Sequence, residues 1–291
     1  MGALPAFLLH LLATTAKTFI VAVRERSPSD KLTSAATFRG CDASVRGGVV
    51  IISHKHRFIM LAAWKTASQT VQARLKPYDE GTYPKYYYFN PHLNRVVHQH
   101  ITCADLIGLP EGRLGYFIGA FVRNPYDRAY SGFWQMQRGM VEQQKWTYPD
   151  PWIGDLVRKQ WSELHSQFRR AEFEFDKWIR IIGDEQVYEI GNNSSFNLHP
   201  AHYWTHVAGA KIANFVGKVE SFESGFQQFI SEVGVGHVEL VNANVVDLKG
   251  DAESNPFGYR YVNRMNSASR SRINDLFNRD FELFGYEKCS H

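Results

Sequence analysis

Two short polar segments, each directly after an apolar run, carry side chains suited to binding an anion. The first segment, residues 64–70 (WKTASQT), follows the apolar run 58–63 and precedes a helical pattern in which Val71 and Leu75 are four residues apart. The first N–H groups of a helix lack intrahelical partners, and the helix dipole adds partial positive charge there. Lys65 adds a full charge, so this loop predicts a phosphate or sulfate site. The hydroxyl donors that it offers are Thr66, Ser68 and Thr70.

The second polar segment begins at Arg123, directly after the apolar run 116–122 (YFIGAFV). Pro125 suits the first turn of a helix and Asn124 suits its cap. Arg123 would then lie at the carboxyl end of a strand, where open α/β sheets bind ligands. Ser131 follows about two helical turns later and can donate to the same anion.

The loop at 64–70 differs from a nucleoside-triphosphate loop. It contains no glycine, whereas that motif needs glycines to wrap closely around two phosphates. We also find no acidic residue at the end of a later strand that would hold Mg²⁺. Taken alone, the loop is more typical of a capped helix beside a solvated lysine.

A pair of histidines provides a candidate base. Residues 95–101 (RVVHQHI) predict a strand, on which His98 and His100 would face the same side. Neutral imidazole accepts a hydroxyl proton near pH 7. We favour His100, which stands directly before a helix start with Thr102 and Asp105 in capping-box positions. Two alternatives stay open, namely half-buried structural histidines and a zinc site shared with His54 and His56.

The two anion-binding segments together resemble the sulfotransferase superfamily. WKTASQT is similar to its loop for the 5′-phosphosulfate of PAPS (3′-phosphoadenosine 5′-phosphosulfate), and RNPYDRAYS is similar to its 3′-phosphate motif. Residues 214–234 and 273–286 resemble the carbohydrate (Golgi-type) branch, and the H-x-H pair resembles the uronyl 2-O-sulfotransferases. The resemblance covers the chain from about 49 to 286.

The resemblance implies roles for individual residues. It implies that Arg123 and Ser131 bind the 3′-phosphate and that Arg260 lies where the chain returns to the nucleotide. It implies His100, or its neighbour His98, as the base, while Lys65 meets charge on the bridging oxygen. The residues implied for the 5′ end are Lys65, Thr66, Ala67, Ser68, Gln69 and Thr70. The cofactor would be PAPS, with PAP (3′,5′-bisphosphoadenosine) as product and no metal required.

The fold class expected is α/β, a P-loop NTPase-like central parallel sheet flanked by helices. At 291 residues, the chain suits an N-terminal extension at 1–48, with an apolar helix and a loop, and one domain at 49–291. A variable helical insertion is expected near 135–170, where tryptophans and basic residues alternate. This pattern of tryptophans and basic residues is compatible with two structures, a groove for an anionic polysaccharide or a helical hairpin with a charged, solvated face.

Composition narrows the partners and the compartment. A net charge of +4 is too small to indicate nucleic acid. Three widely spaced cysteines form neither a disulfide framework nor a zinc motif. Residues 1–23 are apolar, but Lys17 interrupts them and no basic residue precedes it, which disfavours a membrane anchor or signal peptide. We therefore expect a cytoplasmic protein, with the Golgi lumen or secretory pathway as the alternative.

The sequence thus predicts a PAPS-dependent sulfotransferase that acts on a hydroxyl of a carbohydrate, in particular an anionic, glycosaminoglycan-like acceptor. Two rival functions remain, a kinase-like P-loop enzyme and a catalytically silent module that binds sulfated glycans. Two structural details are also expected. Glu220 would form an ion pair with Arg128, and Ser221 would cap the helix that begins directly after Ser221.

Overall fold

The computed structural model describes residues 50–84, 87–142, 148, 150–182, 198–236, 238 and 257–289, with side chains left out at 141 and 142. All of these residues belong to one compact unit, Asp42–His291. The helix and loop predicted at 1–48 lie outside the described residues, so the domain boundary at 48 stays a prediction.

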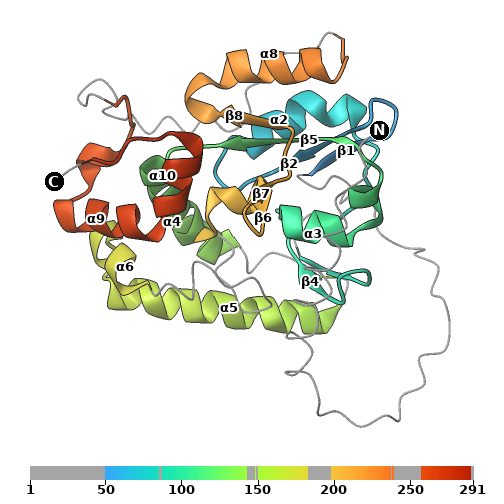
Figure 1. The fold of residues 1–291 in the computed structure, drawn as a ribbon. Helices are drawn as coiled ribbons and strands as arrows, with labels where there is room; N and C mark the ends of the chain where they lie inside the picture. The colour runs from blue at the N-terminus through green and yellow to red at the C-terminus, as the bar shows by residue number, and fades with distance from the viewer. Residues whose placement is uncertain are drawn as a thin grey trace. The chain divides into compact units, whose positions relative to one another are not determined.

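A four-stranded sheet forms the centre of the molecule (Figure 1). Its strands, in spatial order, are β1 (Ile51–Ser53), β2 (Phe58–Leu61), β5 (Phe117–Val122) and β8 (Phe215–Lys218). β2, β5 and β8 are mutually parallel, whereas β1 runs antiparallel to β2 at the edge. The structure is therefore mixed α/β, with a parallel-strand sheet flanked by helices and one antiparallel edge strand.

The strand register brings the two predicted anion-binding segments to the same end of the sheet, the end where β2 and β5 have their carboxyl termini. Leu61 of β2 lies beside Ala120 of β5, and Val122 of β5 lies beside Lys218 of β8. Because the strands are parallel, the loop after β2 and the residues after β5 leave the sheet on the same side. In open α/β sheets, ligands bind at the carboxyl ends of the parallel strands.

Helices α2 (Ser68–Leu75) and α8 (Phe222–Glu232) cover one face of the sheet (Figure 1). Arg74 of α2 is almost completely buried and makes two 2.7 Å contacts with Glu223 of α8. Its guanidinium also lies over the rings of Phe222 and Phe226. The bidentate geometry ties the helix that follows the Lys65 loop to the rest of the layer.

The opposite face of the sheet packs against α3 (Cys103–Gly108) and the short 3₁₀ helix η7 (Ala201–Trp204). Leu61 and Ala120 from the strands meet Leu106 and Trp204 there. The capping box expected at the start of α3 is confirmed, because Thr102 Oγ1 accepts from Asp105 N at 3.2 Å and Asp105 Oδ2 accepts from Thr102 N at 2.9 Å.

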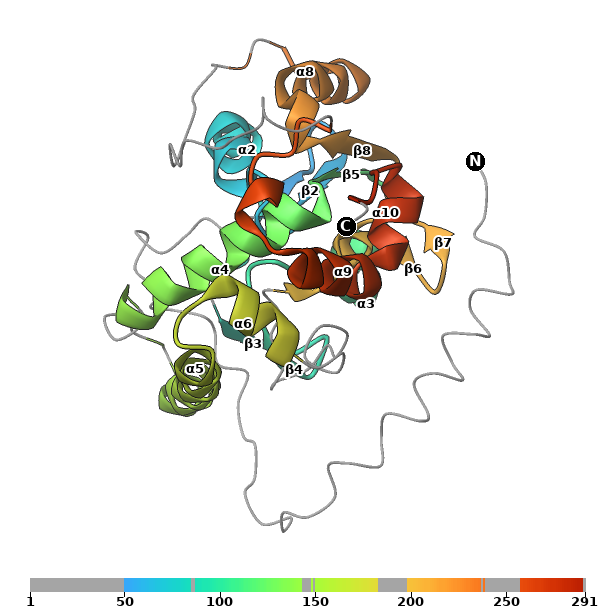
Figure 2. The same cartoon turned by 90° about the vertical axis from the view of Figure 1, so that its left-hand side faces the viewer.

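A helical layer continues from the carboxyl edge of the sheet (Figure 2). It contains α4 (Pro125–Glu142), α6 (Phe175–Ile181), α9 (Ser267–Leu276) and α10 (Asn278–Phe284). Trp64, Phe133, Trp178 and Phe281 belong to its core. The last helical region of the chain is divided in two, because Phe277 leaves the helical conformation at φ −117° and ψ 25° and separates α9 from α10.

Helix α5 (Pro151–Arg170) packs on the hairpin of β3 (Tyr88–Asn90) and β4 (Arg95–Val97) through Val96 and Trp161. The strand predicted at 95–101 ends at Val97, so His98 and His100 lie just beyond it. The remaining short elements are η3 (Lys76–Tyr78), η4 (Pro110–Arg113), β6 (His206–Val207), β7 (Ala210–Lys211), η8 (Val219–Ser221) and η10 (Val262–Arg264).

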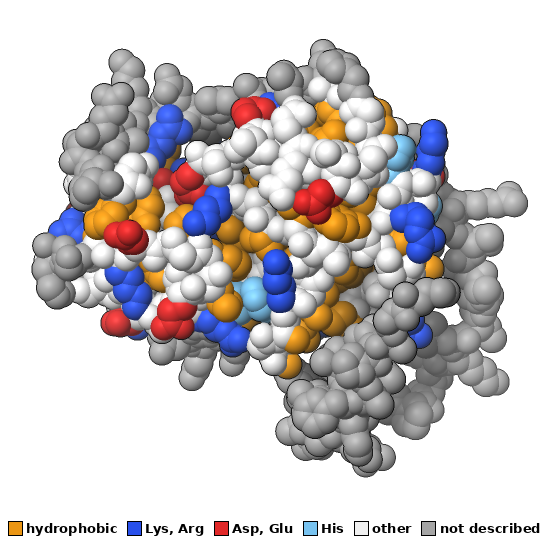
Figure 3. Space-filling model, turned by 45° about the horizontal axis from the view of Figure 1, so that its top comes forward, with side chains coloured by type: hydrophobic (Ala, Val, Ile, Leu, Met, Phe, Trp, Pro, Cys, Tyr) orange, Lys and Arg blue, Asp and Glu red, His pale blue; other side chains and the backbone are white. Residues whose placement is uncertain are grey.

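Charges are mixed on the surface. On the face drawn in Figure 3, basic and acidic side chains alternate with apolar ones, as expected for a small net charge. Among the residues that the structure describes, no helix is both long enough and apolar enough to cross a membrane.

Candidate active site

The loop after β2 is wound tightly by two residues other than glycine. Lys65 has φ 64° and Ala67 has φ 60°, both in the left-handed region. Thr66 lies between them, 1% exposed, and its hydroxyl donates to the carbonyl of Ala63 at 2.8 Å. The Thr66 side chain therefore holds the loop's shape. This geometry leaves the backbone N–H as its means of contacting a ligand.

Helix α2 begins at Ser68, three residues earlier than the helical pattern suggested. Ser68, Gln69 and Thr70 consequently form its first turn, where backbone N–H groups have no intrahelical acceptor. No side chain caps this end, since Ala67 is the N-cap. The helix start thus presents backbone donors beside Lys65, an arrangement suited to an anion.

Trp64 fixes this loop against helix α4. Its indole packs so closely on Gly132 that a Cβ there would come within 2.4 Å of Trp64 Cζ3. Trp64 itself is only 7% exposed and belongs to the core of the helical layer. The loop that carries Lys65 is therefore anchored on the middle of α4.

Three cationic groups lie close together around Lys65. Burial, together with the nearby positive charges of Arg123 and Arg138, lowers the pKa of Lys65 to about 8. Lys65 comes from the loop after β2, Arg123 from the end of β5, and Arg138 from the fourth turn of α4. The fold therefore brings the predicted lysine and arginine into one electrostatic environment.

The first turn of α4 is held by a dense set of hydrogen bonds. Asn124 caps the helix as predicted, its Oδ1 accepting from Asp127 N at 2.9 Å. Its own N–H and its amide nitrogen each donate to Glu220 Oε1 at 2.8 Å. Glu220 follows β8, so this contact joins two neighbouring strand ends beside Arg123.

Asp127 brings a distant segment to the same place. Its carboxylate accepts from the N–H of Arg260 at 3.0 Å and from that of Tyr261 at 2.8 Å. Arg123 lies 3.7 Å from Asp127 and over the Tyr261 ring at 5.7 Å. The structure thus assembles the predicted Arg123 and Arg260 around one carboxylate.

Ser131 lies on α4 two turns beyond Arg123 and is partly buried. Between them, Tyr130 stacks on Tyr261 with ring centroids 5.0 Å apart. The segment carrying Arg260 and Tyr261 therefore runs along the same stretch of α4 as Ser131. Arg123 and Arg260 thus lie at the start of α4, with Ser131 two turns further along the helix.

The two candidate histidines are stacked, with ring centroids 5.1 Å apart. They share one side, as predicted, although they lie beyond the end of the strand. Burial lowers the pKa of His100 to about 4; the hydrogen bond to Ala62 opposes this shift, and Lys65 adds to it. For His98, burial and then His100 lower the pKa well below its usual value. Both imidazoles are therefore neutral at pH 7.

Hydrogen bonds distinguish the two imidazoles. Nδ1 of His100 lies 2.7 Å from the carbonyl oxygen of Ala62, which can only accept, so Nδ1 carries the proton. The lone pair of His100 is then on Nε2, the tautomer that a base requires. His98 Nδ1 instead accepts from the His100 N–H at 3.4 Å, which directs its proton to Nε2.

The zinc alternative finds no support among the described residues, which contain no group of three or more metal-ligating side chains of suitable geometry. His54 Nδ1 lies 3.1 Å from the Tyr116 hydroxyl, and His56 packs edge-on against Tyr78. The two H-x-H pairs therefore have different neighbours.

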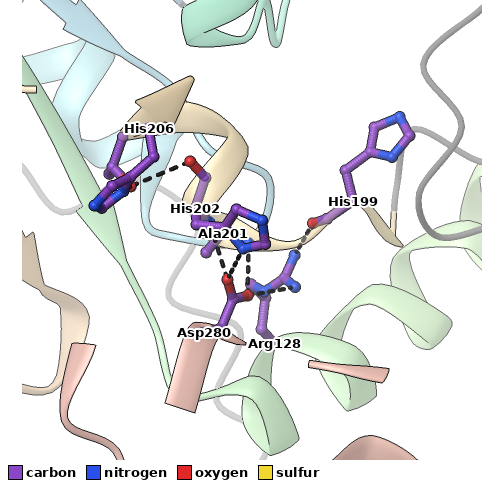
Figure 4. A network of polar contacts seen from close by, with 7 residues as sticks. Arg128, His199, Ala201, His202, His206 and Asp280 are labelled. Carbon is purple, nitrogen blue, oxygen red and sulfur yellow. Dashed lines mark hydrogen bonds and ion pairs between the residues drawn. The ribbon is translucent and has the colours of Figure 1, made fainter. Parts of the chain in front are cut away.

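The expected pairing of Glu220 with Arg128 is wrong. Arg128 points to the other side of α4, where it lies 3.5 Å from Asp280 and donates to the carbonyl of His199 at 2.7 Å (Figure 4). Asp280 also accepts from the N–H groups of Ala201 and His202. Glu220 binds Asn124 and the Tyr286 hydroxyl instead. Ser221 precedes α8, but its side chain makes no capping bond.

Sequence reasoning missed two functional candidates on α4. Arg138 was included only among the many basic residues of 135–170, and Asp127 was given no role. Helical spacing from Ser131 places Arg138 on the same face, seven residues on. No comparable signal marked Asp127, because its partners Arg260 and Tyr261 are more than a hundred residues away in sequence.

A strand-end arginine, a partly buried lysine and a helix start lie at one end of the sheet, an arrangement suited to a ligand with more than one anionic group. The chain belongs to the sulfotransferase family, whose model matches residues 49–287. This assignment supports sulfuryl transfer in general. Searches of curated proteins and of solved structures returned no match.

Proposed function

We propose that the protein is a PAPS-dependent sulfotransferase acting on a carbohydrate hydroxyl. One observation carries the proposal: β2 and β5 are parallel neighbours, so Lys65 and Arg123, which follow them, lie at the same end of the sheet. Two repelling cations so close together are stabilised by a ligand that places an anion on each. A nucleotide with a 5′-phosphosulfate and a 3′-phosphate has this charge pattern.

The loop and helix start would hold the sulfuryl end, and the start of α4 would hold the 3′-phosphate. The residues proposed for the 5′ end are Lys65, Thr66, Ala67, Ser68, Gln69 and Thr70. Arg123 and Ser131 would bind the 3′-phosphate, and Arg260 would approach the nucleotide from the other side of Asp127. A P-loop-like sheet with ligands at its carboxyl edge is consistent with this arrangement.

His100 is proposed as the base, with Nε2 accepting the proton of the attacking hydroxyl. The hydroxyl oxygen forms a bond to sulfur in line with the bond to the bridging oxygen, which breaks as PAP leaves. Lys65 is suited to stabilise the negative charge that grows on that oxygen, and a fixed cation at such a place is usually a large catalytic contribution. The transferred sulfuryl group carries less charge than a phosphoryl group, so the proposal requires no divalent metal.

Support for a carbohydrate acceptor comes from the segments 214–234 and 273–286, which resemble the carbohydrate branch of sulfotransferases. The stacked pair His98 and His100 corresponds to the H-x-H pattern seen in the uronyl 2-O-sulfotransferases. These resemblances favour a sugar hydroxyl, in an anionic glycosaminoglycan-like polymer, over a small phenol or alcohol.

Thermal-shift titrations with PAP and with ATP, each with and without Mg²⁺, test the proposal. PAP is expected to raise the melting temperature in the absence of metal, because binding to the native state alone stabilises it. Stabilisation only by ATP with Mg²⁺ would instead favour a kinase-like enzyme. Binding of sulfated glycans without any transfer from PAPS would favour a silent binding module.

Two variants separate the proposed roles. Arg123→Ala is expected to abolish PAP-induced stabilisation, whereas His100→Ala is expected to keep it and to lose transfer of sulfuryl from PAPS. A His100→Ala variant that loses PAP affinity would place the imidazole in the nucleotide site and remove it from the role of base.

A further inference from the structure

Helix α4 presents a second set of side chains beyond the residues proposed for the cofactor. Trp134, Gln135 and Arg138 follow Ser131 at spacings of three, four and seven residues, so they share one face of the helix. We call these three residues the α4 stripe. Trp134 is 39% exposed, Arg138 is exposed, and Gln135 is partly buried. The α4 stripe thus combines an aromatic surface with a positive charge on one helix face, which suits a sugar that carries an anion.

The α4 stripe lies beside the reacting groups. Trp64 packs on Gly132 and so carries Lys65 over this part of α4. The positive charge of Arg138 is close enough to lower the pKa of Lys65, as is that of Arg123. Lys65 is in turn near enough to His100 to influence its pKa. The lysine therefore stands between the nucleotide end of the site, the base and the α4 stripe.

Arg138 differs from the proposed nucleotide contacts in its charged neighbours and in its position along α4. Arg123 has an anionic neighbour, Asp127, at 3.7 Å and stands at the first turn of the helix. Arg138 is oriented by Gln135, whose Oε1 lies 3.5 Å from Nη2, and it comes two turns after Ser131. The helix rises about 1.5 Å per residue, so Arg138 is roughly 10 Å beyond the predicted 3′-phosphate contact. At that distance Arg138 is better placed to meet an anion other than the 3′-phosphate.

We propose that the α4 stripe is the acceptor subsite, in which Trp134 stacks on a sugar ring and Arg138 pairs with a carboxylate or sulfate of that sugar. Aromatic faces bind the apolar face of a sugar, and the arginine fork matches either anion with two hydrogen bonds. The inference rests on the proposed sulfuryl transfer to a carbohydrate. It identifies the residues that select a charged acceptor and orient its hydroxyl toward His100.

The test measures both binding and turnover with Arg138→Gln and Trp134→Ala. Suitable probes are unsulfated chondroitin, its carboxyl-reduced neutral form, and carboxyl-reduced chondroitin sulfate, which separate carboxylate from sulfate recognition. Arg113→Gln and Leu114→Ala serve as matched controls. Both control side chains are exposed, and they precede β5 at the opposite edge of the sheet.

Arg138→Gln is expected to weaken binding and raise KM about tenfold for the charged polymer that the site recognises, with little change for the neutral one. Trp134→Ala is expected to weaken binding of all three polymers several-fold, roughly in equal measure. PAP affinity, measured in parallel, is expected to stay within twofold for both variants and for the controls.

The outcomes distinguish this subsite from the proposed function. If the wild type binds a charged polymer and Arg138→Gln weakens that binding, the subsite stands even where no sulfuryl transfer is detected, and the proposed function alone fails. If the wild type binds none of the polymers, or Arg138→Gln binds them as tightly as the wild type does, the subsite is wrong. A parallel loss of PAP affinity in Arg138→Gln would assign the guanidinium to the nucleotide.

Discussion

Two groups of charged residues lie on opposite sides of helix α4 and have opposite electrostatic character. On one side, Arg128 is buried between Asp280 and the His199 carbonyl, and the ring of His199 points away from that carboxylate (Figure 4). On the other side, Lys65, Arg123 and Arg138 lie near one another, and burial together with the two guanidinium charges lowers the pKa of the lysine to about 8. The first group is compensated within the fold, whereas the second gathers like charges.

The difference teaches how to separate structural from ligand-binding cations in this chain. A buried guanidinium whose charge is matched by a carboxylate contributes to a fixed tertiary contact. A partly buried lysine beside two guanidinium groups is costly in the empty protein and gains from an anion. Sequence spacing gives no hint of this distinction, because Arg123 and Arg128 stand in the same short motif.

The largest expected effect is on the compensated side. Asp280→Ala removes a carboxylate that is 1% exposed and leaves Arg128 buried without its anion. Breaking such a pair costs about 3–5 kcal/mol of the free energy of unfolding, measured by urea denaturation. PAP affinity of the folded fraction is expected to change little. A loss below about 1 kcal/mol would mean that the buried charge is compensated in another way.

The next effect concerns turnover rather than stability. Lys65→Ala is expected to lower the rate of sulfuryl transfer by roughly 10²–10³, because it removes the cation proposed to stabilise the leaving group. The same change relieves repulsion with Arg123, so the free energy of unfolding is expected to be unchanged or slightly higher. Steady-state kinetics measure the rate of transfer, and urea denaturation measures the free energy of unfolding. A variant that is strongly destabilised would place Lys65 with the compensated group.

The pH dependence of PAP binding sharpens the comparison further. Burial, Arg123 and Arg138 lower the pKa of Lys65 to about 8, so the free protein holds this charge below pH 8 and loses it as the pH rises through 8. The Kd for PAP is therefore expected to be flat from pH 7 to 8 and to rise up to about tenfold per pH unit above that. Calorimetric titration between pH 7 and 9.5 measures it.

Two substitutions serve as controls for that profile. Lys65→Arg keeps its charge at every pH in the range, so the rise above pH 8 is expected to disappear. Arg138→Gln removes one cause of the lowered pKa, so the rise is expected to move to higher pH, and Arg113→Gln is expected to leave it in place. A rise that persists in Lys65→Arg would have to be assigned to another group.

The smallest effect concerns the contact that positions the lysine. Gly132→Ala introduces a Cβ about where the Trp64 ring lies, 2.4 Å from Cζ3. Overpacking of this kind costs typically 1–3 kcal/mol. Because Trp64 carries Lys65, PAP affinity is expected to fall together with stability, whereas Gly139→Ala, which meets Trp161 instead, is expected to affect stability alone. Equal PAP affinity in both variants would separate the tryptophan contact from the site.

Much of the site was predictable where local chemistry decides the structure. An apolar run followed by Arg123, Asn124 and Pro125 predicted a strand, a cap and a helix start, and all three are present. The capping box of Thr102 and Asp105 was predictable for the same reason, since both partners lie within four residues.

The rest depends on partners distant in the sequence. Arg128 was assigned to Glu220, and its true partner Asp280 comes from a helix that contacts α4 only through tertiary packing. The strand at 95–101 stops at Val97, although its apolar pattern continues to Ile101. His100 there turns to the Ala62 carbonyl, a partner that belongs to the loop after β2. Neither outcome follows from periodicity.

The absence of glycine in the loop after β2 has a consequence for how a ligand is met. Lys65 and Ala67 adopt left-handed backbone conformations that cost roughly 1–2 kcal/mol each for residues with a Cβ. Trp64 and the Thr66 hydroxyl hold them there. The conformational work of shaping an anion cradle is thus done during folding. An incoming sulfonucleotide should find the cradle already formed, and little of its binding energy should be spent on ordering the chain.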